Sequence, residues 1–204
     1  FRNRFGLDIP DDKIDEIPYL TFEENSPEFT YMQERRKALG GAFHRRRTSA
    51  NPLQTPPLSA FESLLKASGD GRESSTTMAF VRILNILVKD KQIGKHVVPI
   101  VADESRTFGM EGMFRQLGIW SSVGQLYTPQ DADQLMYYKE DKNGQILQEG
   151  INEAGAMSSW IAAATSYSTH GIQMIPFFIF YSMFGFQRVG DLAWAARDMR
   201  CRGL

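Results

Sequence analysis

The chain has 204 residues, of which 42% are hydrophobic and 23% are charged, as is ordinary for a globular domain. Its formal net charge is −1, so no overall field favours nucleic acid or an anionic membrane as a partner. A single cysteine, Cys201, excludes an internal disulfide framework, and no apolar run reaches the ~18 residues that a membrane helix needs. The three histidines lie too far apart for a metal-ligand spacing.

Residues 1–73 read as an irregular linker segment. Only the stretch 27–39 has a helical pattern, and prolines recur on both sides of it. Such a stretch is expected to wrap a neighbouring domain rather than build its own core. Gly69-Asp70-Gly71 is interpreted as a turn, since no suitably placed asparagine completes a magnesium site.

From residue 74 the pattern becomes regular. Ser75 or Thr76 can cap a helix that runs to about Lys89, with apolar residues along one stripe. Residues 97–102 form a β-branched run that predicts a buried strand, although Pro99 is unusual inside a ladder. A short helix is expected over 109–118.

The second half of the chain repeats this alternation. Residues 127–143 are polar and are interpreted as an inserted excursion. Helices are predicted over 151–169 and 186–200, with a second buried strand over 175–181 between them. Helices alternating with strands indicate an α/β fold with a mostly parallel sheet, flanked by helices, over residues 74–204.

The segment Gln148–Ala156 carries the strongest chemical signal. It places Glu153 at the start of an alanine-rich helix, directly after a glycine turn. A buried glutamate has a raised pKa, because burial disfavours its charged form, and could exchange a proton with a bound heterocycle. The pattern resembles the activating glutamate of thiamine-diphosphate enzymes, although a glutamate in a first helical turn can also serve only the helix dipole.

Polar residues also follow the two predicted strands. Asp103 and Glu104 come directly after the first strand, where ligand groups gather in open α/β sheets. Tyr181, Phe184 and Arg188 follow the second strand, and the Phe184 ring could lie under a planar ligand. Asp103 and Glu104 can equally be surface charges, whereas an aromatic run such as Tyr181–Phe184 is more often part of the core than a cofactor platform.

Taken together, these segments closely resemble the homodimeric pyruvate dehydrogenase component, the decarboxylating subunit of the pyruvate dehydrogenase complex. The resemblance is dense after residue 74 and looser before residue 65. The blocks that carry it are Ser75–Arg82, Ala102–Gly112, Tyr137–Asp141, Gly144–Glu153 and Tyr181–Arg188.

The resemblance implies a pyrimidine-binding α/β domain preceded by a linker. It assigns to Glu153 the hydrogen bond to the aminopyrimidine of thiamine diphosphate, and to Phe184 the packing against that ring. Tyr181 and Glu104 are implied catalytic residues, and Asp103 and Arg188 are implied cofactor contacts. No metal ligand is expected here, since the family's Mg²⁺ ligands belong upstream.

The resemblance further implies a homodimeric cytoplasmic enzyme that acts on pyruvate and transfers an acetyl group to the lipoyl domain of the acetyltransferase component. No nucleic-acid or membrane partner is expected. The chain begins without Met and ends after a helix-stop signal, so we expect a fragment that is truncated at its carboxyl end and inactive alone. Two alternatives stay open: a transketolase-like ketol transfer, and a non-catalytic fragment that only dimerises.

Overall fold

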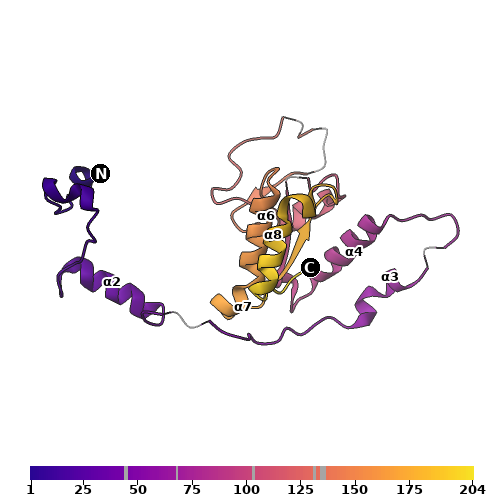
Figure 1. Ribbon diagram of the computed structural model, residues 1–204. Coiled ribbons are helices and arrows are strands. Elements are labelled where there is room, and N and C mark those ends of the chain that lie inside the picture. Colours follow the sequence, from indigo (N-terminus) through magenta and orange to yellow (C-terminus); the bar gives the residue numbers. More distant parts are fainter. Residues whose placement is uncertain (44–45, 68, 103, 131, 134–136) are drawn as a thin grey trace. The chain divides into compact units, whose positions relative to one another are not determined.

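The computed structural model describes residues 1–43, 46–67, 69–102, 104–130, 132–133 and 137–204. Packing divides the chain into two units, Phe1–Arg46 and Arg47–Leu204, and each is described by itself (Figure 1). None of the helices in these ranges is both long enough and apolar enough to cross a membrane.

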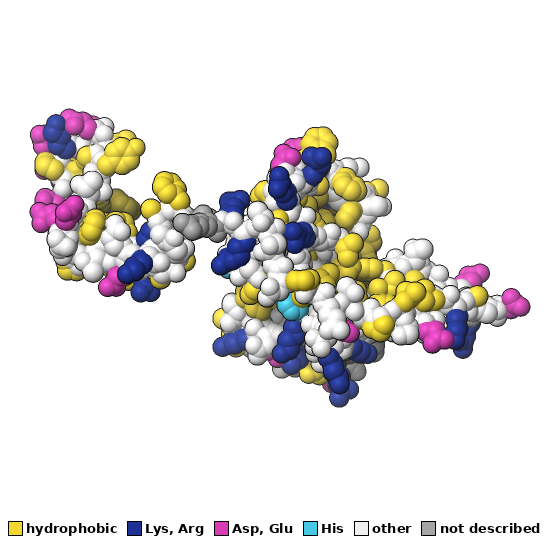
Figure 2. All heavy atoms as spheres, turned by 90° about the horizontal axis from the view of Figure 1, so that it is seen from below, with side chains coloured by type: hydrophobic (Ala, Val, Ile, Leu, Met, Phe, Trp, Pro, Cys, Tyr) yellow, Lys and Arg dark blue, Asp and Glu magenta, His cyan; other side chains and the backbone are white. Residues whose placement is uncertain are grey.

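The amino-terminal unit contains only short helical elements, and none of its described residues is buried. Its longest helix, α2 (Pro27–Ala38), begins where Ser26 Oγ accepts a hydrogen bond from the Phe29 N–H at 3.2 Å. Hydrophobic side chains, yellow in Figure 2, lie at the surface of this unit among charged ones. Two further elements precede α2: α1 (Arg2–Phe5) and the 3-10 helix η1 (Asp11–Glu16).

The expectation of a single helix before residue 74 is therefore wrong, although α2 itself is confirmed. Two more short elements, η2 (Leu58–Phe61) and α3 (Glu62–Leu65), follow it in the second unit. Runs this short carry too few residues for a helical period to show in the sequence. The predicted glycine turn is confirmed, because Gly69 and Gly71 have positive φ values of 83° and 79°.

The second unit is built on a parallel sheet. Its three strands lie in the spatial order β4 (Leu147–Gln148), β1 (Val97–Val101) and β5 (Ile175–Ile179). A short 3-10 helix, η3 (Gly94–His96), directly precedes β1 in the chain. β1 pairs with β5 along its whole length, and both pairings of β1 are parallel. A smaller parallel pair joins β2 (Ile119–Trp120) to β3 (Glu140–Asp141). The predicted α/β fold is confirmed.

Helices cover both faces of this sheet. On one face lie α4 (Thr76–Lys89) and α5 (Glu111–Leu117), and on the other lie α6 (Glu153–Ala164) and α8 (Gly185–Asp198), which run side by side in Figure 1. Alternate residues of each strand enter opposite cores, as the pleat requires. The α4 core includes Leu84, Val97, Val101, Phe114, Phe177 and Ile179, and the α6 core includes Val98, Ile100, Ala156 and Phe178.

Pro99 in β1 and Pro176 in β5 lie inside paired strands. The surroundings of Pro99 show how the sheet tolerates its missing N–H. The Val97 and Val101 carbonyls accept bonds from Gln145 Nε2 and the Glu149 N–H, so alternate residues of β1 face β4. Pro99 shares this side, but the register with β4 begins only at Ile100. A proline there interrupts no ladder bond.

Three sequence expectations need correction. The strands β2 and β4 were not anticipated, because two residues cannot display a strand period. The end of the supposed excursion over 127–143 forms β3. The helix expected over 151–169 divides into α6 and α7 (Ser166–Thr169) at Thr165, whose hydroxyl donates to the Ile161 carbonyl at 2.8 Å. Such bonding of a hydroxyl to the preceding turn disturbs a helix.

Candidate active site

Three predicted site residues lie at the carboxyl ends of the three parallel strands. Glu104 follows β1, Glu153 follows β4, and Tyr181 follows β5. Since carboxyl ends of parallel strands share one edge of a sheet, the fold gathers these segments where α/β proteins bind ligands. Asp103 was predicted for the same edge, but it lies outside the described residues.

Glu153 is the first residue of α6 and is only 7% exposed. Gly150, with a φ of 74°, makes the turn that leads into the helix, and Asn152 Oδ1 accepts a hydrogen bond from the Gly155 N–H at 3.0 Å. The cap therefore starts the helix one residue before Glu153. A carboxylate in this first turn is stabilised by the positive end of the helix dipole.

Arg188, from the first turn of α8, supplies the counter-charge of Glu153. Its Nη1 donates to both carboxylate oxygens at 2.8 Å. The same guanidinium lies over the Phe184 ring, with its central carbon 4.4 Å from the ring centroid. The structure thus joins Glu153, Arg188 and Phe184, which the sequence had placed in two separate segments.

This ion pair reverses one expectation. The hydrogen bond from Arg188 holds the pKa of Glu153 below its usual range, and the backbone hydrogen bond at the helix start acts in the same direction. Burial acts the other way but is the smaller effect. The predicted raised pKa is therefore wrong, since burial was considered without the arginine.

Tyr181 makes a different contact. Its ring lies 4.9 Å from that of Phe108, between centroids, and Tyr181 is 38% exposed. Glu104 accepts hydrogen bonds through its backbone carbonyl from the Thr107 hydroxyl and N–H. Both residues therefore lie at this edge of the sheet, and the Tyr181 carbonyl accepts a hydrogen bond from the Phe184 N–H at 2.9 Å.

Sequence reasoning missed a buried polar contact between two strand ends. Ser105 is only 2% exposed, and its hydroxyl donates to Gln148 Oε1 at 2.5 Å. The bond joins the segment after β1 to the end of β4. Both residues lie inside the motif blocks, but a sequence carries no sign that two residues so far apart are hydrogen-bonded.

A tyrosine cluster beside this contact was also missed. The Tyr127 and Tyr138 hydroxyls donate to the same Glu140 oxygen at 2.7 Å and 3.0 Å. Burial first, and then the hydrogen bond to Glu140, raise the pKa of Tyr138. With Gln148 and Gly150, these residues line a polar pocket of about 520 Å³. Its position extends the candidate site towards β2 and β3.

The side chains of the described residues offer no cluster that could bind a metal ion. The described residues contain no group of three or more histidine, cysteine or carboxylate side chains that could hold an ion. The edge of the sheet instead offers one buried carboxylate, one arginine and aromatic rings. Such a donor set suits a flat organic group with a polar edge.

Comparison with known proteins identifies the family. A family model described as the pyruvate dehydrogenase E1 component middle domain matches residues 58–204. The pyruvate dehydrogenase E1 component of Cupriavidus necator is 68% identical over 203 residues, which are 100% of this chain and 23% of that relative. The corresponding proteins of Pseudomonas aeruginosa and Escherichia coli are 63% and 56% identical, and 100% and 99% of this chain align with 23% of their length.

The chain thus spans 23% of the length of these relatives. The matched region includes every predicted site residue, and the boundary predicted between residues 73 and 74 stays a prediction. The family resemblance inferred from the sequence motifs is confirmed. This chain belongs to the family of the pyruvate dehydrogenase E1 component middle domain.

Proposed function

We propose that the longer protein containing this chain carries out the thiamine-diphosphate-dependent oxidative decarboxylation of pyruvate, with transfer of the acetyl group to a lipoyl group. This chain would supply the residues that hold the aminopyrimidine of the cofactor. The observation that carries the proposal is the buried carboxylate of Glu153 at the carboxyl edge of the sheet, in a chain of this family.

The residues present fit this cofactor. Glu153 offers an acceptor for a ring nitrogen, and Phe184 offers a flat apolar surface close to the same arginine. When bound, thiamine diphosphate supplies an electron sink, which takes up the electron pair of the carbon–carbon bond that breaks as carbon dioxide leaves. The Mg²⁺ that accompanies the diphosphate would take its ligands from another part of the longer protein.

Glu153 has a specific task in this proposal. As an ionised carboxylate it accepts a hydrogen bond from a protonated nitrogen, and so holds a proton at the aminopyrimidine ring. Arg188 keeps the carboxylate charged before the cofactor binds. Tyr181, Glu104 and Asp103 are proposed to line the space around the cofactor and pyruvate, with Tyr181 and Glu104 taking part in the reaction.

The proposal extends to the partners of the longer protein. They are pyruvate, the lipoyl domain of the acetyltransferase component and a second identical subunit, in the cytoplasm. The 204-residue chain alone would be inactive, because it supplies only the aminopyrimidine half of the site. Sedimentation of the longer protein, with and without a lipoyl domain, measures both associations.

The decisive experiment compares Glu153→Gln with wild type in the longer enzyme, by thiamine-dependent release of carbon dioxide from pyruvate. Glutamine keeps the shape but cannot hold the proton, so the rate should fall by about 10²–10⁴. Glu149→Gln is the matched control, since Glu149 lies on the same turn and bonds instead to the Ser159 hydroxyl. Normal turnover of Glu153→Gln, or wild-type preference for a ketose phosphate, contradicts the proposal.

A further inference from the structure

Arg47, the last residue of a basic run that starts at position 44, is fixed to α7. Its N–H donates to the Ser168 carbonyl at 3.0 Å, and its Nη1 donates to the Thr169 carbonyl at 3.1 Å. Its guanidinium also packs against Gly171, where an added Cβ would lie 3.2 Å from Nε. These contacts keep the charge of Arg47 at one place on the surface of the second unit.

Arg202 is fixed to the other end of the loop between α7 and β5. Its Nη1 donates to Gln173 Oε1 at 3.0 Å, and its Nη2 donates to the Thr48 carbonyl at 3.3 Å, beside Arg47 in the chain. Its guanidinium carbon lies 3.9 Å from the centroid of the Tyr167 ring. Two guanidinium groups, from positions far apart in the sequence, therefore flank one short loop.

The positive charge of this cluster is not offset by any ion pair within the described residues. A third arginine, Arg200, lies beside it, since its carbonyl accepts a hydrogen bond from the Tyr167 hydroxyl at 2.9 Å. The carboxylate nearest to Arg200 in the sequence, Asp198, pairs with Arg197 at 3.8 Å. Figure 2, seen from the side of α7, shows more dark-blue than magenta side chains on this part of the unit.

An apolar side chain lies between the two fixed arginines. Ile172 stands in the loop between the residue that contacts Arg47 and the residue that contacts Arg202, and it is 51% exposed. Arginine is enriched at protein interfaces, where an apolar centre is surrounded by polar groups. Four exposed residues thus form one basic surface: Arg47, Ile172, Arg200 and Arg202.

We propose that this basic surface binds a segment of a partner protein that carries several carboxylates beside an apolar residue. Guanidinium groups bind carboxylates through paired hydrogen bonds, and both fixed arginines keep N–H donors that no described residue uses. Nucleic acid fits less well, because Tyr167 is only 5% exposed under Arg202 and offers no ring for a base to stack on.

The basic surface lies away from the candidate active site. Its loop leads into the amino end of β5, whereas Glu153 follows the carboxyl end of β4. The inference therefore does not depend on the proposed function. Loss of binding to this surface should leave the turnover of pyruvate unchanged.

Fluorescence anisotropy with the longer protein tests the proposal. The probe is a labelled synthetic peptide of glutamate and leucine, and its matched control has glutamine in place of every glutamate. The acidic peptide should bind more tightly than the control, and added salt should weaken it, because exposed charges are screened. Absence of binding, equal binding of the two peptides, or tighter binding of a single-stranded oligonucleotide overturns the proposal.

Single substitutions locate the binding. Arg200→Gln removes a charge whose side chain has no hydrogen bond or ion pair with a described residue, so the fold should be kept. It should weaken the acidic peptide about two- to fivefold, and Arg47→Gln combined with it should weaken the peptide further. Arg115→Gln, at an exposed position of α5 on the opposite face of the sheet, is the matched control and should change nothing.

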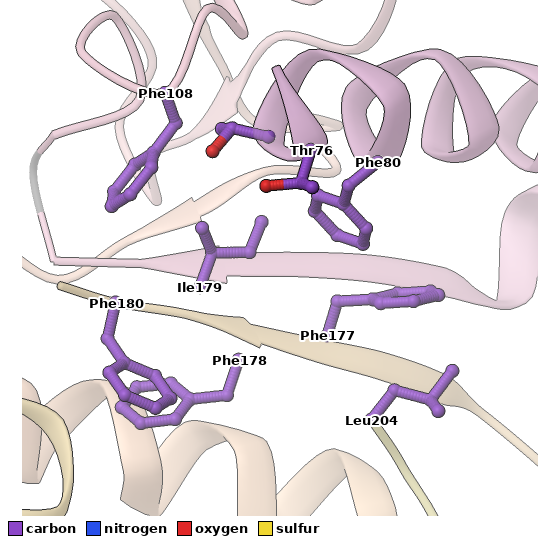
Figure 3. A pocket seen from close by; sticks show the side chains of 9 residues that line it. Thr76, Phe80, Phe108, Phe177, Phe178, Ile179, Phe180 and Leu204 are labelled. Carbon is purple, nitrogen blue, oxygen red and sulfur yellow. The ribbon is translucent and has the colours of Figure 1, made fainter. Parts of the chain in front are cut away.

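The same variants distinguish a second place where the peptide could bind. An apolar pocket of about 510 Å³ lies beside β5, and aromatic side chains such as Phe80 and Phe108 line it (Figure 3). The described residues that line it have uncharged side chains, so a peptide held there through leucine would respond neither to salt nor to Arg200→Gln. That result, or an equal loss in Arg200→Gln and Arg115→Gln, contradicts the assigned surface.

Discussion

Arg188 Nη1 lies 2.8 Å from both carboxylate oxygens of Glu153. The ion pair joins the first residue of α6 to the first turn of α8, and these two helices pack together on one face of the sheet. The same guanidinium covers the Phe184 ring. One arginine therefore contacts both groups that we propose for the aminopyrimidine, and the charge of the site depends on it.

Replacing this arginine should raise the pKa of Glu153. Arg188→Met keeps an apolar stem but removes the donor, so the pKa moves upward from its lowered value because the largest cause of the lowering is lost. Carbon-detected NMR titration of the glutamate carboxyls measures the change. Arg197→Met, an exposed arginine on the same helix, is the control and should leave Glu153 unchanged. An unaltered titration in Arg188→Met contradicts the assigned cause.

The same ion pair makes stability depend on pH. The pKa of Glu153 is lower in the folded chain than its usual 4.5, so its stabilisation is present above that value and disappears as pH falls through the lowered pKa. Wild type should therefore lose more stability on acidification than Arg188→Met does. Urea unfolding at a series of acidic pH values makes this comparison. If the free energy of unfolding falls equally with pH in both proteins, the ion pair makes no contribution.

The 204-residue chain should bind thiamine diphosphate weakly. It offers the carboxylate and ring for the aminopyrimidine, but the described residues include no metal-binding group for the diphosphate. Isothermal titration in the presence of Mg²⁺, with the longer protein as positive control, measures the affinity. Saturable sub-micromolar binding, with a Kd below ~1 μM or a binding free energy beyond about −8 kcal/mol, is incompatible with half a site.

Two glycines of α8 should respond oppositely to alanine. A Cβ at Gly185 would lie 1.9 Å from Phe180 Cε2, whereas nothing lies within 4 Å of one at Gly190. Gly185→Ala should destabilise the chain by about 1–3 kcal/mol through overpacking. Gly190→Ala should stabilise it by roughly 0.5–1 kcal/mol, since alanine favours a helix interior. Urea unfolding distinguishes these signs, and similar effects at both sites would disprove the packing of Phe180.

The buried Ser105 hydroxyl should contribute measurably to stability. Ser105→Ala removes its bond to Gln148 and should cost about 0.5–1.5 kcal/mol in the free energy of unfolding. Ser158→Ala is the matched control, since that exposed hydroxyl donates only to the Ala154 carbonyl of its own helix. Thermal or urea unfolding compares the two variants, and a Ser105→Ala effect no larger than the control argues against the strand-to-strand bond.

Elements with strong local signals were predicted from the sequence. α4 begins at the Ser75 cap, whose Oγ accepts the Met78 N–H at 3.1 Å, and its apolar stripe faces the core. β1 and β5 are continuous apolar runs, as strands buried on both faces require. β4 was missed, because a two-residue strand acquires its structure from pairing with β1 rather than from its own composition.

The α/β class, the major helices and strands, and the family can all be predicted from the sequence, because cap, period and motif are properties of neighbouring residues. The packed fold was needed to show that Arg188 contacts Glu153, 35 positions earlier, and that the pKa of the carboxyl is lowered rather than raised. It alone also revealed the bond between Ser105 and Gln148 and the contacts of Arg47 with α7. Electrostatic and hydrogen-bonding partners distant in the chain are set by how helices and strands pack, which no local pattern encodes.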